Sequence, residues 1–280
     1  MILFKKAGDI HDYLQKAKKQ GKSIGFIPTM GALHPGHISL LKNAKKNDPI
    51  VVCSIFINPT QFNDANDFNK YPSTLEKDID ELEKAGCDIL FLPSITEIYP
   101  EGTKNTTPYD LGYLETVLEG KYRPGHFQGV CQVVHRLLNI IPASRLYIGQ
   151  KDYQQCMVIK KLVELIHLKI SITICPTLRE PDGLAMSSRN IRLTESDRKK
   201  ALKIYETLSF IKKQLKPGNL ITLKEMALKN LIAEGFTVDY VELANADTLE
   251  PVNDYDGKPA LVALAAAFLH DVRLIDNILL

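Results

Sequence analysis

Residues 28–37 read Pro-Thr-Met-Gly-Ala-Leu-His-Pro-Gly-His and join an apolar strand to the start of a helix. The strand is expected over residues 24–27. The helix is expected to begin near Pro35, whose fixed φ suits the first position of a helix, and apolar residues recur along one side of it. Free backbone N–H groups at such a helix start attract anions. His34 and His37 can therefore face one bound phosphate chain.

Two other roles for these histidines stay open. His-x-x-His can be half of a metal site, although no Glu follows the first His and no third ligand lies at a recognisable spacing. Both histidines can also be purely structural. Other phosphate-binding motifs are absent from the sequence: no Gly-x-Gly-x-x-Gly occurs, and Lys16 stands where a P-loop ending in Gly21-Lys22-Ser23 needs its first Gly.

The composition describes a globular protein that binds a small ligand rather than a polymer. With 280 residues, 45% of them hydrophobic and 24% charged, the chain is long enough for one large or two ordinary domains. The formal net charge is only +2, and lysines are interleaved with acids. No broad basic face is therefore expected, and nucleic acid is not an expected partner.

Cysteine usage and hydropathy indicate a cytoplasmic protein without a membrane partner. The five cysteines are odd in number and show no Cys-x-x-Cys spacing, so they are expected to be reduced core residues. The N-terminus lacks the sustained apolar segment of a signal peptide. The longest apolar run, residues 260–269, is too short to span a bilayer and is expected to form a buried strand.

Apolar, β-rich runs alternate with helical patterns in the first 176 residues. The runs cover residues 24–27, 50–57, 88–92, 145–148 and 170–175. Such alternation predicts an α/β fold with a Rossmann-like, doubly wound parallel sheet. The clearest helix is expected over residues 127–141, where apolar residues follow the i, i+3, i+4 rule and Pro142 ends the pattern.

The pattern changes after Pro176. Two helices are expected over residues 195–215 and 223–234, followed by strands over residues 238–243, 261–268 and 273–280. Helices followed by strands predict a separate, smaller C-terminal α+β domain. We therefore expect a Rossmann-like domain over residues 1–176 and the α+β domain over residues 177–280.

A second candidate nucleotide-binding segment lies at this domain junction, over residues 179–190. Ser187, Ser188 and Arg189 follow a turn that contains Gly183, and hydroxyl groups and a guanidinium suit phosphate oxygens. An ordinary polar loop with a solvated arginine is the alternative. The position at the junction favours a phosphate clamp that closes over the ligand.

Two further polar clusters follow predicted strands, at the carboxyl ends where open α/β sheets hold their ligands. Residues 56–62 come directly after the second strand. In residues 147–155, Gly149 permits close approach of a ligand, Lys151 can meet a phosphate and Asp152 can accept a hydrogen bond from a ribose hydroxyl. Each cluster alone can be turn chemistry, but together with residues 28–37 they direct polar groups from three strand ends at one crevice.

The residues that carry these motifs resemble one family. His34-Pro35-Gly36-His37 resembles the His-x-Gly-His signature of the nucleotidylyltransferase superfamily, and Met186-Ser187-Ser188-Arg189 resembles the mobile loop of that superfamily. With the two strand-end clusters, Tyr71-Pro72, residues 119–127 and residues 273–277, they identify the chain as a member of the pantoate:β-alanine ligase (pantothenate synthetase) family. The resemblance covers nearly the whole chain.

This resemblance implies an AMP-forming carbon–nitrogen ligase of pantothenate biosynthesis, which supplies the precursor of coenzyme A. In the family, (R)-pantoate attacks the α-phosphate of Mg-ATP to give pantoyl adenylate and pyrophosphate, and the amine of β-alanine then displaces AMP to form pantothenate. Adenylation is needed because a carboxylate is a poor acyl donor. The family also implies a homodimer, a C-terminal domain that acts as a lid, and Mg²⁺, whose direct ligands the sequence leaves unknown.

The resemblance assigns roles to individual residues. It implies that His34 and His37 bind the phosphates, with His37 as the candidate proton donor, and that Lys151, Ser187, Ser188 and Arg189 stabilise the triphosphate. The expected ATP site comprises Met30, Gly31, Ala32, Leu33, His34, Pro35, Gly36, His37, Gly149, Gln150, Lys151, Asp152, Leu178, Met186, Ser187, Ser188 and Arg189. The expected site for pantoate and β-alanine comprises Gln61, Gln155, Asn58 and Tyr71. Amide side chains suit that site because they donate to a carboxylate and accept from a hydroxyl without adding charge.

Pro35, Thr60 and Ser73 depart from the commonest family pattern, and His126 receives no role. Two other functions share part of the signal. A plain adenylyltransferase would share the histidines but would need no glutamines for a carboxylate substrate. A nucleotide-binding regulatory module would be expected to lose phosphate contacts, and all of them are present in this sequence. RNA binding, as in the related tRNA synthetases, is disfavoured by the weak net charge.

Overall fold

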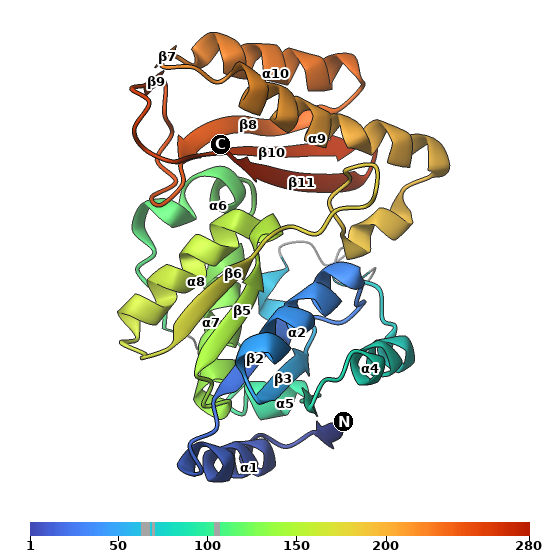
Figure 1. Ribbon diagram of the computed structural model, residues 1–280, viewed down its shortest axis with the longest axis vertical. Helices are drawn as coiled ribbons and strands as arrows, with labels where there is room; N and C mark the ends of the chain where they lie inside the picture. Colours follow the sequence, from blue (N-terminus) through green and yellow to red (C-terminus); the bar gives the residue numbers. More distant parts are fainter. Residues whose placement is uncertain (63–67, 69–70, 104–106) are drawn as a thin grey trace. The chain divides into compact units, whose positions relative to one another are not determined.

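The structure is a computed structural model of the 280-residue chain, and it describes residues 1–62, 68, 71–103 and 107–280. The chain forms two compact units (Figure 1). The N-terminal unit comprises Met1–Gly149 and Val158–Pro176, and the C-terminal unit comprises Gln150–Met157 and Thr177–Leu280. The segment Gln150–Met157 thus groups with residues beyond Pro176 rather than with its neighbours in the sequence.

The N-terminal unit is built on a six-stranded parallel sheet, which confirms the predicted doubly wound α/β fold. The strand order is β1-β4-β3-β2-β5-β6, with every neighbouring pair parallel. All five predicted strands are present. The sequence does not predict β1, because this strand has only three residues and lies at the exposed edge. The strands are β1 (Ile2–Phe4), β2 (Ile24–Thr29), β3 (Ile50–Ile55), β4 (Ile89–Phe91), β5 (Arg145–Gly149) and β6 (Ser171–Cys175).

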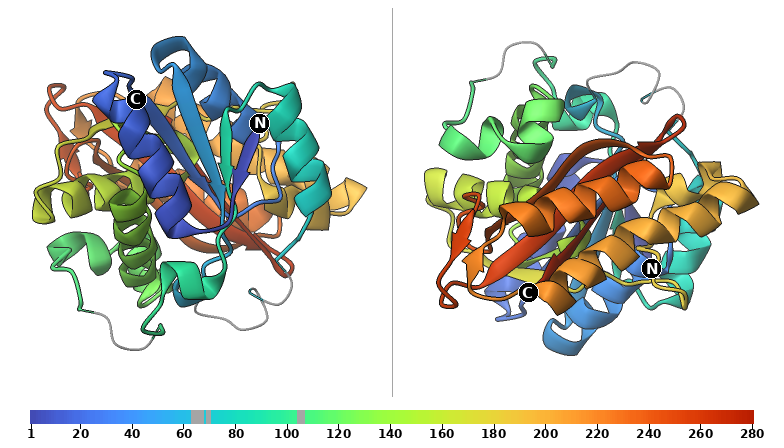
Figure 2. Two further views of the ribbon diagram at one scale, coloured as in Figure 1. Left: turned by 90° about the horizontal axis from the view of Figure 1, so that it is seen from below. Right: turned by 90° about the horizontal axis from the view of Figure 1, so that it is seen from above.

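Helices and short 3-10 turns connect these strands. The predicted helix start at Pro35 is confirmed, and the helix predicted over residues 127–141 is displaced by one residue. Helix α2 packs against β2, β3 and β5, whereas α1 packs against α7 (Figure 2, left). The helices are α1 (Ala7–Lys19), α2 (Pro35–Asn47), α4 (Leu75–Lys84), α5 (Ile95–Ile98), α6 (Leu118–Tyr122), α7 (His126–Ile140) and α8 (Tyr153–Leu165), with turns η1 (Pro59–Gln61), η2 (Gly112–Glu115) and η3 (Gln150–Asp152).

The strand order creates a switch point between β2 and β5. These two strands are neighbours, and the chain continues from β2 to β3 on one side and from β5 to β6 on the other. Ligands of open α/β sheets bind at the carboxyl ends of strands where the order reverses in this way. Thr29 and Gly149 are the last residues of the two strands. The predicted nucleotide-binding segments after them therefore begin at the switch point.

The core of the N-terminal unit is formed by apolar side chains of the sheet and of α2. Ile27, Leu41, Val51 and Leu90 are at most 1% exposed and belong to one cluster. All five cysteines are buried and none forms a disulfide, which confirms the prediction that they are core residues.

The C-terminal unit is an antiparallel sheet covered by two helices, as predicted for an α+β domain. Its strands β8 (Thr237–Asn245), β10 (Leu261–Leu269) and β11 (Val272–Leu279) pair in the order β11-β10-β8. Helices α9 (Glu195–Gln214) and α10 (Ile221–Ala233) lie across this sheet (Figure 2, right). A further two-stranded pair, β7 (Gly218–Asn219) and β9 (Asp254–Tyr255), is not predicted by the sequence.

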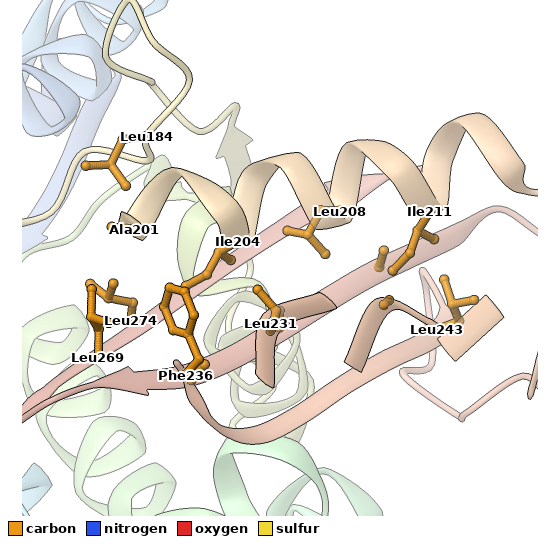
Figure 3. Close-up of a cluster of buried hydrophobic side chains, with 14 of the residues drawn as sticks. Leu184, Ala201, Ile204, Leu208, Ile211, Leu231, Phe236, Leu243, Leu269 and Leu274 are labelled. Atoms are coloured by element: carbon orange, nitrogen blue, oxygen red, sulfur yellow. The ribbon is translucent and has the colours of Figure 1, made fainter. Parts of the chain in front are cut away.

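The core of this unit is formed by apolar side chains from its helices and from its antiparallel sheet. Ile204, Leu208 and Ile211 lie on one side of α9, and Figure 3 shows them facing Leu231 and Leu243. The apolar run over residues 260–269 forms the buried central strand β10, as predicted. Among the residues that the structure describes, no helix combines the length and the apolar character needed to cross a membrane.

Candidate active site

A buried carboxylate holds the turn that follows β2. Asp78, in the first turn of α4, is 1% exposed. It accepts the backbone N–H groups of Ala32 and Leu33, each at 2.8 Å. The hydroxyl of Thr74 donates to the same carboxylate at 3.0 Å. Three donors thus compensate the desolvation of this charge and fix the main chain just before the histidine pair.

The conformation of the same turn requires a glycine. Gly31 and Ala32 have positive φ angles of 81° and 49°, and a Cβ atom at Gly31 would lie 3.1 Å from Oδ2 of Asp78. The hydroxyl of Thr29 accepts the N–H of Gly31 at 3.3 Å and donates to the carbonyl of Ser54 at 2.7 Å. The turn is therefore tied to the neighbouring strand β3 as well as to α4.

His34 and His37 cap the helix that begins between them. His34 is the N-cap of α2, and its Nδ1 accepts the N–H of Gly36 at 3.1 Å. Nδ1 of His37 accepts the N–H of His34 at 3.3 Å, which completes a capping box. The two ring centroids are 4.1 Å apart. Both imidazoles are thus fixed at the positive end of the dipole of α2.

These hydrogen bonds define where the proton of each neutral ring lies. A nitrogen that accepts a hydrogen bond carries no proton, so in both rings the proton is on Nε2. Each histidine can then donate Nε2–H to a phosphate oxygen while its Nδ1 continues to cap the helix. Within the described residues, no group of three His, Cys, Asp or Glu side chains could hold a metal ion.

Asn58 orients the amide of Gln61. Asn58 is 1% exposed, and its Nδ2 donates to Oε1 of Gln61 and to the carbonyl of Gly129, each at 3.1 Å. Its Oδ1 accepts the hydroxyl of Tyr99 at 2.8 Å. Nε2 of Gln61 lies 2.8 Å from the sulfur of Met30. Because the polar atoms of Asn58 have partners inside the N-terminal unit, its geometry favours positioning of Gln61 over contact with substrate.

His126, which receives no role from the sequence, supports Gln61 from α7. Its Nδ1 is 2.8 Å from the carbonyl oxygen of Gln61, and its Nε2 is 3.1 Å from the guanidinium of Arg123. A carbonyl only accepts and a guanidinium only donates, so the ring is neutral with its proton on Nδ1. Gly129 lets α7 approach η1 closely, since a Cβ atom there would lie 2.2 Å from the carbonyl oxygen of Thr60.

Other predicted residues border this arrangement. A cavity of about 280 Å³ adjoins the turn after β2, and its walls include Met30, Ala32 and Ser73. Tyr71 packs its ring edge-on against Phe62, with the centroids 5.7 Å apart. Met30 therefore contacts Gln61 and also lines this cavity.

The departures from the family pattern have local structural consequences. Pro35 occupies the first position of α2, where its missing N–H costs no hydrogen bond. The hydroxyl of Thr60 donates to Oδ1 of Asn58 at 3.0 Å, a bond that an apolar residue could not make. Ser73 is exposed, and nothing in its contacts explains the departure.

The C-terminal unit carries the second group of predicted residues. Gln150, Lys151 and Asp152 form η3, and Gln155 lies in the first turn of α8. At Gly149, the residue before this turn, a Cβ atom would have no heavy atom of the described residues within 4 Å. The protein itself thus leaves room for a side chain at this strand end.

The predicted loop at residues 179–190 is an ordered hairpin that leads into the turn η4 (Ser188–Arg192). The N–H of Met186 donates to the carbonyl of Leu178 at 3.1 Å. Oγ of Ser187 accepts the N–H of Arg189 at 3.2 Å, so Ser187 caps η4. These contacts give the Ser-Ser-Arg segment a defined conformation within its own unit.

The predicted residues thus form one group in each unit. Turn 30–37, Asn58 and Gln61 are connected within the N-terminal unit, and η3 and the hairpin belong to the C-terminal unit. Sequence reasoning assigns no role to two residues that support the site, Asp78 and His126. Both residue types are common in helices and loops, so only the long-range hydrogen bonds reveal their roles.

The N-terminal unit has a parallel sheet with a phosphate-suited imidazole pair at its switch point, and the C-terminal unit has one turn with a lysine and another with serine and arginine side chains. Together these features define a nucleotide-binding enzyme of the α/β class. The sequence profile described as pantoate-beta-alanine ligase matches residues 2–279. The chain belongs to the pantoate–β-alanine ligase family.

Individual relatives agree with this assignment. The chain is 45% identical to a pantothenate synthetase from Cytophaga hutchinsonii, over 96% of this chain and 95% of that protein. It is 43% identical to one from Caldicellulosiruptor bescii, over 99% and 98% of the two chains. The solved pantothenate synthetase from Thermus thermophilus superposes with a TM-score of 0.90 at 36% identity, covering 99% of each chain. A pantoate-beta-alanine ligase from Francisella tularensis, complexed with "beta-gamma ATP" and β-alanine, gives a TM-score of 0.82 at 41% identity, covering 100% of this chain and 97% of the other.

Proposed function

We propose that this chain condenses (R)-pantoate with β-alanine, using one ATP, to give pantothenate, AMP and pyrophosphate through a pantoyl adenylate. The observation that carries this proposal is the link between the imidazole pair and Gln61. Met30 contacts the amide of Gln61 and begins the turn that ends at His34. The turn before α2 and the neighbouring η1, joined by this contact, thus present donors for phosphate and an uncharged clamp for a hydroxy acid. The Francisella relative, complexed with "beta-gamma ATP" and β-alanine, supports these two ligands.

The first half-reaction transfers the adenylyl group to pantoate. A carboxylate oxygen of pantoate attacks the α-phosphorus of ATP, and the bond from this phosphorus to the bridging oxygen of pyrophosphate breaks. Negative charge moves onto the pyrophosphate, where hydrogen-bond donors stabilise it most if they are already in place. Nε2–H of His34 and of His37 supply such donors. The helix caps at Nδ1 hold both rings in position before ATP arrives.

An amide clamp suits the nucleophile. A cationic side chain would stabilise the pantoate carboxylate before reaction and so weaken it as a nucleophile. Gln61 can orient the substrate through neutral hydrogen bonds, and Gln155 is proposed to do the same from the C-terminal unit. Tyr71 completes the proposed substrate site, and Asn58 and His126 hold Gln61 in place.

In the second half-reaction the neutral amine of β-alanine attacks the carbonyl carbon of the adenylate. The bond from this carbon to the phosphate oxygen breaks, AMP leaves with the bonding electrons, and the nitrogen loses a proton as the amide forms. The phosphate donors of the first step also suit this leaving group. Water has to be excluded at this stage because it would hydrolyse the adenylate.

The C-terminal unit is proposed to bind the triphosphate and to act as a lid. Lys151, Ser187, Ser188 and Arg189 supply the charge and the hydroxyl groups for phosphate oxygens. Asp152 would accept from a ribose hydroxyl. A lid that closes only over bound ATP would exclude water during the life of the adenylate. The remaining proposed ATP contacts are Gly31, Ala32, Leu33, Pro35, Gly36, Gly149, Gln150, Leu178 and Met186.

Mg²⁺ is proposed to enter with ATP. Its preferred oxygen ligands can be phosphate oxygens and water, with little direct contribution from side chains. When bound, the ion would offset the charge that develops on pyrophosphate. We further propose, from the family resemblance, that the protein works as a homodimer in the cytoplasm, a reducing compartment that suits its five free thiols.

Pyrophosphate exchange tests the proposed function. The purified chain is incubated with ATP and labelled pyrophosphate, with and without pantoate, and label in ATP is measured. We expect exchange only with pantoate, because only the reversible first half-reaction returns label to ATP. Addition of β-alanine is then expected to release AMP. Exchange that needs a phosphorylated acceptor instead of pantoate would indicate an adenylyltransferase and refute the proposal.

A further inference from the structure

Asn277 ties the turn that carries Lys151 to the sheet of the C-terminal unit. The side chain of Asn277, on β11, is 2% exposed. Its Nδ2 donates to the carbonyl oxygens of Gln150 and Lys151, each at 2.9 Å. Its Oδ1 accepts the side-chain amide of Gln150 at 3.2 Å. One buried side chain thus holds two successive peptide groups of η3.

The arrangement needs an amide at this position. Two carbonyl oxygens require two donors, and the amide of Gln150 requires an acceptor. Among side chains of this size only asparagine offers both. An aspartate would place negative charge against two carbonyl oxygens.

The strand that carries Asn277 is itself fixed at this point. Asp276, 5% exposed, accepts both terminal nitrogens of Arg179, at 2.6 and 2.9 Å. Arg179 also donates to the carbonyl of Asn277 at 3.1 Å, and its guanidinium lies 4.2 Å from the ring centroid of Tyr205. Successive side chains of a strand face opposite sides. β11 therefore anchors the 179–190 hairpin through Asp276 and the Lys151 turn through Asn277.

We propose that Asn277 is a positioning residue for ATP binding, which acts by fixing the main chain of Lys151. This inference rests on the proposed function, because it assumes that Lys151 binds the triphosphate. The lysine side chain is long and flexible, so the place of its Cα atom decides how often the ammonium group reaches a phosphate. Loss of Asn277 releases that Cα atom without removing the charge.

A double-mutant cycle tests this coupling. The dissociation constant of a nonhydrolysable ATP analogue is measured for the wild type, Asn277→Ala, Lys151→Ala and the double variant. We expect Asn277→Ala to raise the dissociation constant about tenfold, the effect of one lost buried hydrogen-bond partner. In the Lys151→Ala background the same change is expected to have less than about a twofold effect, because residues that act as one unit are not additive.

The outcomes separate this inference from the proposed function. An equal effect of Asn277→Ala in both backgrounds would mean that Asn277 is merely structural and would overturn the inference alone. An unchanged dissociation constant in Lys151→Ala would overturn the assumed role of Lys151 and the inference with it. Asn219 offers a matched control, since its Oδ1 accepts the N–H of Ile221 at the start of α10. Asn219→Ala is expected to leave ATP binding unchanged. If Asn277→Ala does not fold, Asn277→Ser, which keeps one donor, enters the same cycle.

Discussion

Asp78 accepts a hydrogen bond of 2.8 Å from the backbone N–H of Leu33, although 45 residues separate the two in the sequence. We expect Asp78→Asn to lower the free energy of unfolding by about 1–3 kcal/mol, because the new amide would direct a donor at one of the two backbone donors. Urea unfolding measures this change. The rate of pyrophosphate exchange is expected to fall as well, since the turn before His34 loses its support.

Asp80 supplies the control for that experiment. It lies on the exposed side of the same helix, and it pairs with Lys84. Exposed ion pairs contribute little, so Asp80→Asn is expected to match the wild type in urea. Wild-type stability of Asp78→Asn would contradict the role assigned to the buried carboxylate.

Alanine at Gly129 and alanine at Gly149 are expected to affect different properties, the first stability and the second ATP binding. A Cβ atom at Gly129 would lie 2.2 Å from the carbonyl oxygen of Thr60, whereas one at Gly149 would meet no described heavy atom within 4 Å. Gly129→Ala is expected to destabilise the protein by about 1–3 kcal/mol, the cost of overpacking. Gly149→Ala is expected to keep its stability but to bind ATP more weakly, because the methyl group would enter the space proposed for the nucleotide. Normal ATP affinity in Gly149→Ala would remove Gly149 from the proposed site.

The support that His126 gives to Gln61 is expected to appear in the Michaelis constants. His126→Ala leaves the carbonyl of Gln61 without this donor, and we expect KM for pantoate to rise about tenfold. KM for ATP is expected to change little. In His126→Asn the amide can imitate Nδ1, so partial rescue is expected. A rise in both constants to the same extent would point to a general loss of structure.

His37 is expected to affect catalysis and stability through different atoms. His37→Ala removes the proposed phosphate donor, and we expect turnover to fall on the order of 10²–10³-fold. It also removes a capping contact, so the free energy of unfolding is expected to fall by about 1 kcal/mol. Glutamine at this position of a capping box can reach back to the N-cap N–H. His37→Gln is therefore expected to restore stability in urea. Near-normal turnover of His37→Ala would refute the catalytic assignment.

The cysteines are expected to resist alkylation in the native state. Burial raises the pKa of Cys87 to about 11 and that of Cys131 to about 12, and the thiolate is the reactive form. At pH 8 an alkylating reagent is expected to modify native protein slowly and guanidinium-unfolded protein at all five cysteines. The same shifts affect stability, because the folded pKa values exceed the unfolded value of 9.0. The free energy of unfolding is therefore expected to keep the full contribution of the protonated, buried thiols below pH 9 and to lose it as the pH rises through the folded pKa values. Rapid native labelling would contradict the buried positions.

The fold could be predicted largely from the sequence because its signals are local. The apolar runs of β2, β3 and β10 and the periodicity of α7 lie within single elements, and the turn residues around Pro35 mark a helix start. The strand β1 gives too short a signal, and its pairing with β4 depends on residues 87 positions away (Ile2 with Ile89). Strand order is a property of such long-range pairs.

The site could be predicted only in part for the same reason. His34, His37 and Lys151 stand in motifs whose chemistry can be read from neighbouring residues. In the sequence, Asp78 looks like an ordinary acidic residue in the first turn of a helix. Asn277 looks like an ordinary polar residue of a strand. Their importance comes from backbone groups that they meet from distant positions, and no spacing rule in one sequence indicates such a partner.

The double use of each imidazole explains why a basic side chain could not replace it. Lysine and arginine attract phosphate at least as strongly, but they have no lone pair with which to receive the N–H groups at the start of α2. Either substitution would therefore leave a backbone N–H group at the start of α2 without the acceptor that the imidazole provides. The neutral histidine ring carries a donor, Nε2–H, on one edge and an acceptor, Nδ1, on the other. A phosphate ligand requires the donor and the first turn of α2 requires the acceptor, and histidine provides both.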